Sequence, residues 1–227
     1  AEVDDAAKEL RDNPTLGRKI VVGAIPTLAP YLLSQLIDRC RTQLPHLEIH
    51  TQEGFRTNLV EGVIAGDLDL ALLSLPVADH RLSIEPLFTE PLLLVVSKSH
   101  RLAGQKIVTA EDLATENFVL LGDSSTLTAQ IQRFCGDHDF EPRIVHRCAQ
   151  IATVKALVGL GVGISILPQV TRSHEDRRTL VYRALSGRAP LREIAVVRHL
   201  QRYQSRGAEQ FLAVLRAESS VSRDLPI

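Results

Sequence analysis

Residues 20–52 constrain the fold of this chain more than any other stretch, because strand, turn, helix and strand follow one another directly. Residues 20–25 are almost entirely apolar, which is typical of a strand in a mostly parallel sheet covered by helices on both faces. From residue 28 to about residue 42 the apolar side chains recur at helical spacing. The stretch therefore predicts an α/β fold with a parallel sheet.

The alternation of predicted strands and helices continues after residue 52, and a second alternating unit follows later in the chain. A predicted helix at 57–65 and a strand at 68–73 complete a βαβαβ unit with right-handed crossovers. Residues 84–88 and 91–96 read as two further strands. A second unit occupies roughly 97–188, with its predicted elements at 118–121, 125–136, 143–146, 151–160 and 163–167.

A strand at 194–197 and a helix at 203–218 remain after the second unit closes, so we expect the chain to return to the first. Its two crossings would form a two-stranded hinge between two Rossmann-like lobes. Residues 19–94 with 194–227 would make lobe I, and 95–193 would make lobe II. Such a plan places a ligand cleft between the lobes and lets a ligand shift an open/closed equilibrium.

Composition excludes several classes of function. The net charge is -1 and the sequence pI is about 6.8, so these residues have no general attraction to nucleic acid or to an anionic membrane. No apolar run reaches the roughly 18 residues of a membrane span, and the acidic start is unlike a signal peptide. We therefore expect a cytoplasmic protein without a membrane contact.

Neither catalysis nor a metal site is indicated. The histidines are scattered, and the sequence has no HExxH, GxSxG, P-loop or nucleotide-binding glycine motif after the first strand. Cys40, Cys135 and Cys148 are too few and too dispersed for a metal site or a disulfide framework, and we expect buried reduced thiols. Hence we predict no cofactor, no metal and no enzyme activity.

Several motifs together resemble the effector-binding domain of LysR-type transcriptional regulators. They are the segments at 23–27 and 30–33, Gly66 to Ala71, Glu90 to Leu92 with residues 99–103, and residues 159–164 before Leu167 and Pro168. The resemblance implies a type 2 periplasmic-binding-protein-like fold and a small-molecule effector. It also implies self-association to dimers or tetramers, and DNA binding only through an N-terminal helix-turn-helix absent from this sequence. Residues 1–18 resemble the end of the linker helix.

Within that family, residues 25–27 and 30–33 are most similar to the peroxide-sensing OxyR branch. The resemblance aligns Cys135 with the resolving cysteine of that branch and Thr126 with its reactive cysteine. A threonine hydroxyl cannot follow the oxidation chemistry of a thiol. We therefore expect ligand binding rather than peroxide sensing, with a redox role for Cys135 and Cys148 as an alternative.

Loops at the carboxyl ends of the predicted strands supply the candidate ligand-binding residues, because open α/β sheets bind ligands there. In lobe I the candidates are Thr27, Arg56, Thr57 and Ser74, and in lobe II they are Ser125, Thr126 and Gln150. Arg56 beside free helix N–H groups suits a carboxylate or a similar anion.

Each candidate also has a simpler interpretation. Thr27 and the run from Asp123 to Thr126 are suitable helix caps, and Arg56, Ser74 and Gln150 are suitable solvated residues of loops and turns. Gly161 and Gly163 permit tight packing of the following strand. Two other functions share a two-lobed plan: a free-standing periplasmic solute-binding protein, and a transferase or deaminase, for which we find no catalytic acid.

Overall fold

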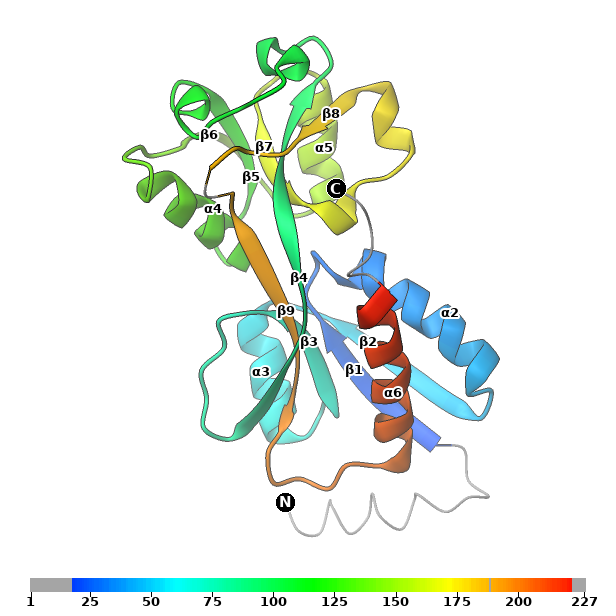
Figure 1. Ribbon diagram of the computed structural model, residues 1–227. Coiled ribbons are helices and arrows are strands. Elements are labelled where there is room, and N and C mark those ends of the chain that lie inside the picture. The colour runs from blue at the N-terminus through cyan, green and yellow to red at the C-terminus, as the bar shows by residue number, and fades with distance from the viewer. Residues whose placement is uncertain (1–17, 188, 222–227) are drawn as a thin grey trace. The chain divides into compact units, whose positions relative to one another are not determined.

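The computed structural model describes residues 18–187 and 189–221, which form two compact units (Figure 1). Unit 1 comprises the described parts of Ala1–Thr89 and Glu193–Ile227, and unit 2 comprises the described part of Glu90–Arg192. Of the linker-helix end expected at residues 1–18, residues 1–17 lie outside the described residues. Each unit contains both strands and helices, so the α/β class expected from the sequence is confirmed.

Unit 1 is built on a sheet whose core strands are parallel. Its strands are β1 (Arg18–Ala24), β2 (Leu47–Glu53) and β3 (Leu70–Ser74), with parts of β4 (Leu82–Ser97) and β9 (Leu191–His199). Strand β1 pairs in parallel with both β2 and β3, whereas β9 runs antiparallel to β3. The predicted parallel βαβαβ unit is therefore confirmed.

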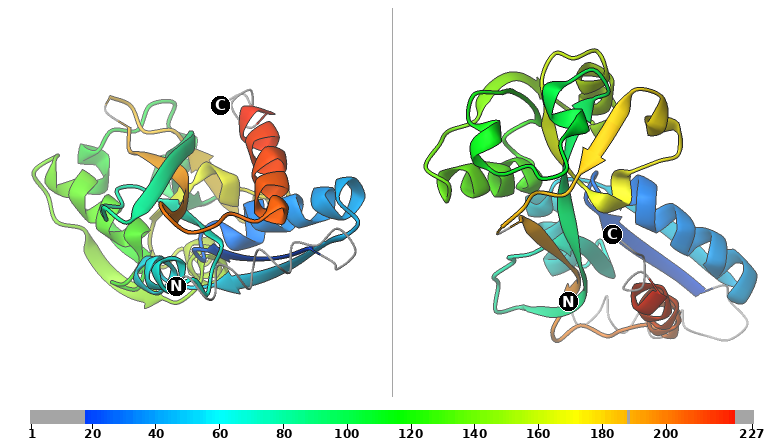
Figure 2. Two further views of the ribbon diagram at one scale, coloured as in Figure 1. Left: turned by 90° about the horizontal axis from the view of Figure 1, so that it is seen from below. Right: turned by 45° about the horizontal axis from the view of Figure 1, so that its top comes forward.

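Helices cover the two faces of this sheet. A π-helix, η1 (Ala29–Leu33), leads into α2 (Ser34–Gln43), and two further helices are α3 (Arg56–Ala65) and α6 (Arg206–Val221). Helices α2 and α6 pack together on one face, and α3 lies on the other (Figure 2, left). Every residue of β3 is buried, as expected for a strand covered on both sides.

Unit 2 contains a second set of parallel strands. Its elements are β5 (Asn117–Leu121), α4 (Thr126–Gly136), β6 (Arg143–Cys148), α5 (Ile151–Gly159), β7 (Ser165–Pro168) and β8 (Leu180–Arg183), with 3-10 turns η2 (Arg101–Gly104), η3 (Glu111–Leu113), η4 (Gln169–Thr171) and η5 (Glu175–Arg178). Strands β5 and β6 are parallel, and β7 and β8 pair antiparallel with β4. Sequence periodicity does not indicate β8.

Strands β4 and β9 carry the chain from one unit to the other and are neighbours in the strand order, which confirms the expected two-stranded hinge. The prediction of two separate strands at 84–88 and 91–96 is wrong, since β4 is one strand of 16 residues. Pro91 is compatible with an extended backbone. Glu90, whose polarity indicated a break between two strands, is buried in an ion pair. The strand therefore continues through both residues.

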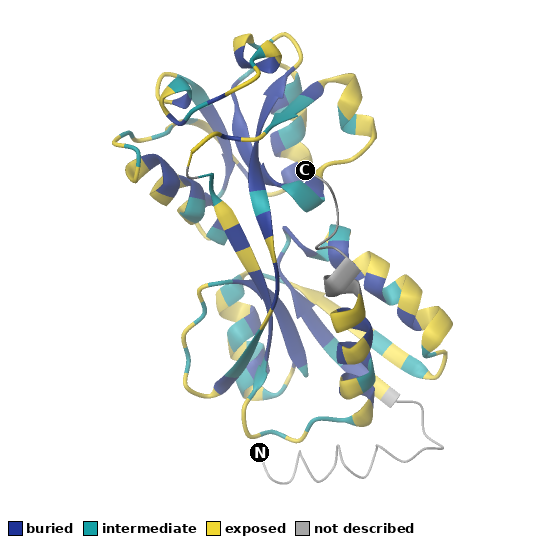
Figure 3. Cartoon of the chain, in the orientation of Figure 1, coloured by how far each residue is buried: buried dark blue, intermediate teal, exposed yellow. Residues whose placement is uncertain are grey.

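Buried side chains are concentrated in the strands and on the inner faces of the helices (Figure 3). Cys40, Cys135 and Cys148 are all buried free thiols, as predicted. No helix within residues 18–187 and 189–221 is both long and apolar enough to cross a membrane.

Candidate functional site

The lobe I candidates lie at one edge of the unit 1 sheet, at the carboxyl ends of three neighbouring strands. Thr27 follows β1, and Ser74 is the last residue of β3, which is paired with β1. Arg56 and Thr57 begin α3 after β2, the other neighbour of β1. The parallel register therefore brings these four residues to the same edge.

Arg56 is held in place by a neutral partner. Its Nη1 donates a hydrogen bond of 2.7 Å to the carbonyl oxygen of Pro76, just beyond β3. Among the described residues no carboxylate forms an ion pair with it. The bond fixes the guanidinium but leaves its positive charge uncompensated, which suits an anion.

Thr27 and Ser74 are both buried, with exposed fractions of 4% and 1%. The capping interpretation of Thr27 is wrong, because η1 begins at Ala29 and Leu28 occupies its N-cap position. Helix α3 likewise starts from Phe55, whose side chain gives no capping hydrogen bond. The Phe55 side chain thus does not cap the N–H groups in the first turn of α3, which begins at Arg56.

The lobe II candidates follow β5 and β6 in unit 2. Leu121 and Cys148 are partners at the ends of these parallel strands, and the Gly122 N–H donates to the Cys148 carbonyl at 2.9 Å. Ser125 and Gln150 are the N-cap residues of α4 and α5, and neither side chain makes a capping hydrogen bond. The structure thus brings the two helix starts to one edge, and the simple capping role of Ser125 is wrong.

Two contacts at this edge were not predicted. The Arg147 Nη1 contacts Asp123 Oδ1 at 2.5 Å, so the acidic residue of the predicted capping run is neutralised. Thr128 Oγ1 donates to the Leu121 carbonyl at 2.9 Å and ties the first turn of α4 to β5. Nothing local in the sequence links Asp123 to Arg147, because only the parallel register of β5 and β6 brings them together. With Asp123 paired, no unpaired carboxylate from this run opposes an anion near Ser125 and Thr126.

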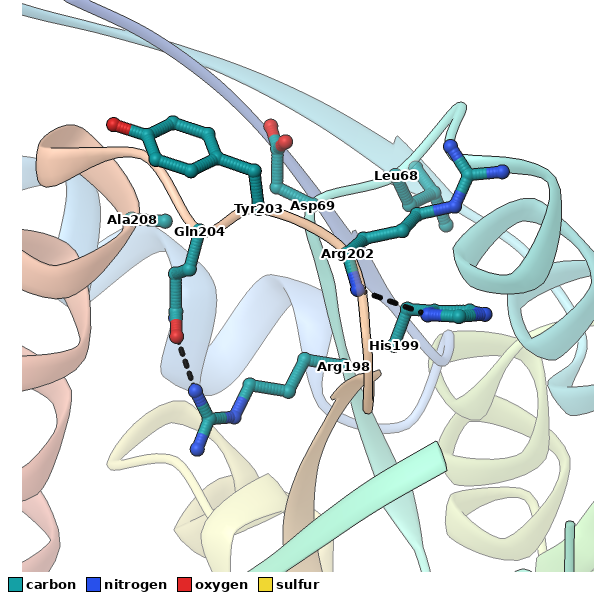
Figure 4. Close-up of a pocket in the computed structure, with 8 residues that line it drawn as sticks. All are labelled: Leu68, Asp69, Arg198, His199, Arg202, Tyr203, Gln204 and Ala208. Atoms are coloured by element: carbon teal, nitrogen blue, oxygen red, sulfur yellow. Dashed lines mark hydrogen bonds between the residues drawn. The ribbon is translucent and has the colours of Figure 1, made fainter. Parts of the chain in front are cut away.

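A small cavity elsewhere in unit 1 involves none of these residues. Figure 4 shows its lining around the turn from β9 to α6, where the Arg202 N–H donates to His199 Nδ1 at 3.2 Å and Arg198 contacts Gln204. Its volume of about 20 Å³ is room for roughly one water molecule. This cavity is therefore too small for an organic effector.

The cysteines are poorly placed for redox chemistry. Cys135 is fully buried in α4, and burial raises the pKa of its thiol to about 12. Burial also raises the pKa of Cys148. The thiolate is the reactive form, so both residues have the character of structural thiols. No group of histidine, cysteine and carboxylate side chains suitable for a metal ion occurs in the described part of the chain.

These features define an α/β ligand-binding module of two units that are joined by paired strands. The LysR substrate binding domain model matches residues 15–220, and the chain belongs to this family. It is the effector-binding domain of a LysR-type regulator, as the sequence motifs indicated.

Individual relatives agree with this assignment. The chain is 28% identical to the uncharacterized HTH-type transcriptional regulator YcgK of Bacillus subtilis, over 94% of this chain and 71% of that protein. It is 30% identical to the DNA-binding transcriptional dual regulator OxyR of Escherichia coli, over 81% of this chain and 60% of OxyR. The chain therefore matches about three fifths of the OxyR sequence.

Solved structures show the same fold. The C-terminal domain of a probable LysR family transcriptional regulator from Rhodococcus sp. RHA1 matches with a TM-score of 0.80 and 27% identity, covering 88% of this chain and 99% of that one.

Proposed function

We propose that this domain senses a small polar or anionic effector, which it binds through Thr27, Arg56, Thr57 and Ser74 of unit 1 and through Ser125, Thr126 and Gln150 of unit 2. The observation that carries the proposal is Arg56, a guanidinium fixed by Pro76 without a carboxylate partner among the described residues. Arginine in this state binds carboxylates and other oxyanions through charge-assisted hydrogen bonds.

The starts of α3, α4 and α5 supply further donors. None of their N-cap side chains makes a capping hydrogen bond. N–H groups at a helix start favour negative charge, and hydroxyls beside them at Thr57, Ser125 and Thr126 add donors and acceptors of fixed position. This chemistry selects polar anions over apolar ligands.

The effector acts by changing a conformational equilibrium and not by undergoing reaction. An effector that binds one arrangement of a regulator better than another shifts the population by its difference in affinity. We assign DNA contact to a helix-turn-helix outside these 227 residues, and propose that the regulator assembles as a dimer or tetramer in the cytoplasm. Light scattering of the purified chain tests the assembly.

The test of the effector site is a thermal-shift screen of small carboxylates and other anions, followed by calorimetry of each compound that raises the melting temperature. Arg56→Ala and Thr126→Ala should each weaken binding by about tenfold or more, as expected when a hydrogen bond to a charged group is lost. Arg41→Ala, at an exposed arginine of α2, is the matched control and should bind as the parent chain does. Unchanged binding in both Arg56→Ala and Thr126→Ala would refute the site.

Peroxide sensing is the alternative, and the raised pKa of Cys135 argues against it. The solute-binding alternative is not retained, because the family and the relatives consist of transcriptional regulators.

A further inference from the structure

A second candidate binding site lies on unit 2, between the connection that holds η4 and η5 and strand β8 (Figure 1, yellow). It is an open depression of about 300 Å³, at the lower end of the range for small-molecule pockets. The residues that line it include Arg172, Arg177 and Arg183. None of the effector-binding candidates contributes to it, so it is separate from the site proposed above.

The carboxylate in this depression is already compensated. Asp176 Oδ2 accepts hydrogen bonds from Lys155 Nζ at 2.7 Å, from the Ser173 N–H at 2.8 Å and from the Tyr182 hydroxyl at 2.7 Å. Burial opposes ionisation of Asp176, but these bonds outweigh it and lower the pKa of the carboxyl. Since Lys155 neutralises Asp176, this carboxylate does not compensate the positive charges of the three arginines in the lining.

Two of those arginines are exposed and have no carboxylate partner within the described residues. Arg172 lies over the ring of Tyr182, with Cζ 5.7 Å from the ring centroid, which orients its guanidinium without neutralising it. Arg177 belongs to η5, five residues further along the same connection. Their fork-shaped donor groups match the oxygens of carboxylates and phosphates.

The third arginine is anchored by backbone oxygens. Arg183 Nη2 donates to the Ala103 carbonyl at 2.5 Å, and its Nη1 contacts the Tyr182 carbonyl at 3.4 Å. Its Nε is buried without a hydrogen-bond partner in the described part of the structure. Arg183 thus contributes a fixed positive charge to the lining of the depression.

We propose that this depression binds a small organic or inorganic polyanion, with Arg172 and Arg177 as its main ligands and Arg183 as a fixed supporting charge. Three uncompensated guanidinium groups around a volume of this size favour a compact molecule with two or more negative groups over a single carboxylate. Either a polyphosphate or a polycarboxylate satisfies this chemistry.

The test is calorimetric titration of the 227-residue chain with pyrophosphate and, separately, with propane-1,2,3-tricarboxylate at constant ionic strength. We expect at least one of the two to bind with one site per chain. Binding of only one of them identifies the phosphate or the carboxylate class, and binding of both identifies a general polyanion site. The double variant Arg172→Gln, Arg177→Gln should weaken binding by about tenfold or more.

Arg178→Gln is the matched control, because Arg178 is an exposed arginine of the same turn η5 but does not line the depression. It should bind like the parent chain, and so should Arg56→Gln in unit 1. The proposal is overturned if neither anion binds, or if Arg178→Gln weakens binding as much as the double variant does. It is also overturned if Arg56→Gln abolishes binding, because the anion would then occupy the effector site.

Discussion

The Glu90 carboxylate and the Arg192 guanidinium form a buried ion pair in unit 2, at the first and last residues of that unit. Arg192 Nε and Nη2 each lie 2.7 Å from Glu90 Oε1, and the Val170 N–H donates to Glu90 Oε2 at 2.9 Å. The exposed fractions of the two residues are 6% and 2%. Both charges are thus removed from water and depend on each other.

Glu90→Ala should destabilise the chain by about 3–5 kcal/mol, because it removes the carboxylate that neutralises the buried Arg192 charge. Urea unfolding measures the change in the free energy of unfolding. Arg147→Gln removes an arginine from the exposed pair with Asp123 and should have little effect. A loss as small as that of the control would show that Arg192 finds water or another partner.

Asp176 gives a pH-dependent contribution to stability. The pKa of its carboxyl is lowered in the folded chain. As the pH falls, Asp176 therefore takes up its proton more readily in the unfolded state than in the folded state. The stabilisation is therefore complete above the ordinary aspartate pKa of about 4 and is lost as the pH falls below it. Unfolding at a series of pH values should show a steeper acid loss for the parent chain than for Asp176→Asn. Asp38→Asn, at an exposed aspartate of α2, should keep the parent slope.

The thiol of Cys135 should be unreactive near neutral pH, because burial raises its pKa to about 12 and little thiolate forms. Titration with a thiol reagent should label it slowly in the native chain, and all 3 cysteines should react after denaturation. Peroxide treatment before denaturation should leave that total unchanged. A Cys135–Cys148 disulfide in peptide maps would instead support the redox alternative.

Gly163→Ala should destabilise unit 2, because a Cβ there would lie 2.5 Å from the carbonyl oxygen of Asn117 in β5. Backbone atoms cannot move aside as a flexible side chain can, so we expect a loss of about 1–3 kcal/mol, typical of overpacking. Thermal denaturation measures it as a lower melting temperature. Gly104→Ala is the control, since no atom lies within 4 Å of its added Cβ. Equal melting temperatures would mean that β5 shifts without loss.

Residues 20–52 could be assigned from sequence because apolar spacing alone separates strand from helix there, and β1, α2 and β2 follow that pattern. The single strand β4 could not be recognised, because Glu90 is buried only through Arg192, which is 102 residues away along the chain. Local polarity carries no information about such a partner. The tight packing at Gly163 was readable, since a glycine entering a strand indicates a close backbone neighbour.

Part of the candidate effector site can also be proposed from the sequence. The rule that ligands bind at the carboxyl ends of strands selects Thr27, Arg56 and Ser74 without coordinates. It does not reveal that Pro76 holds Arg56, or that Arg147 pairs with Asp123, because both contacts join separate strands or loops. The depression around Arg172 and Arg177 was missed entirely, since β8 has no clear periodicity in the sequence.

Unit 2 is one continuous segment, whereas unit 1 is interrupted by it and takes β9 between β3 and β4. During synthesis from the amino terminus, the ribosome therefore releases all of unit 2 before the strand that completes the unit 1 sheet. The edge of β3 that pairs with β9 therefore stays unpaired while about a hundred further residues are synthesised. Nascent chains stalled when the residues up to 192 have left the ribosome exit tunnel, with the rest of β9 still inside it, should consequently contain a folded second unit and a first unit that is still sensitive to protease.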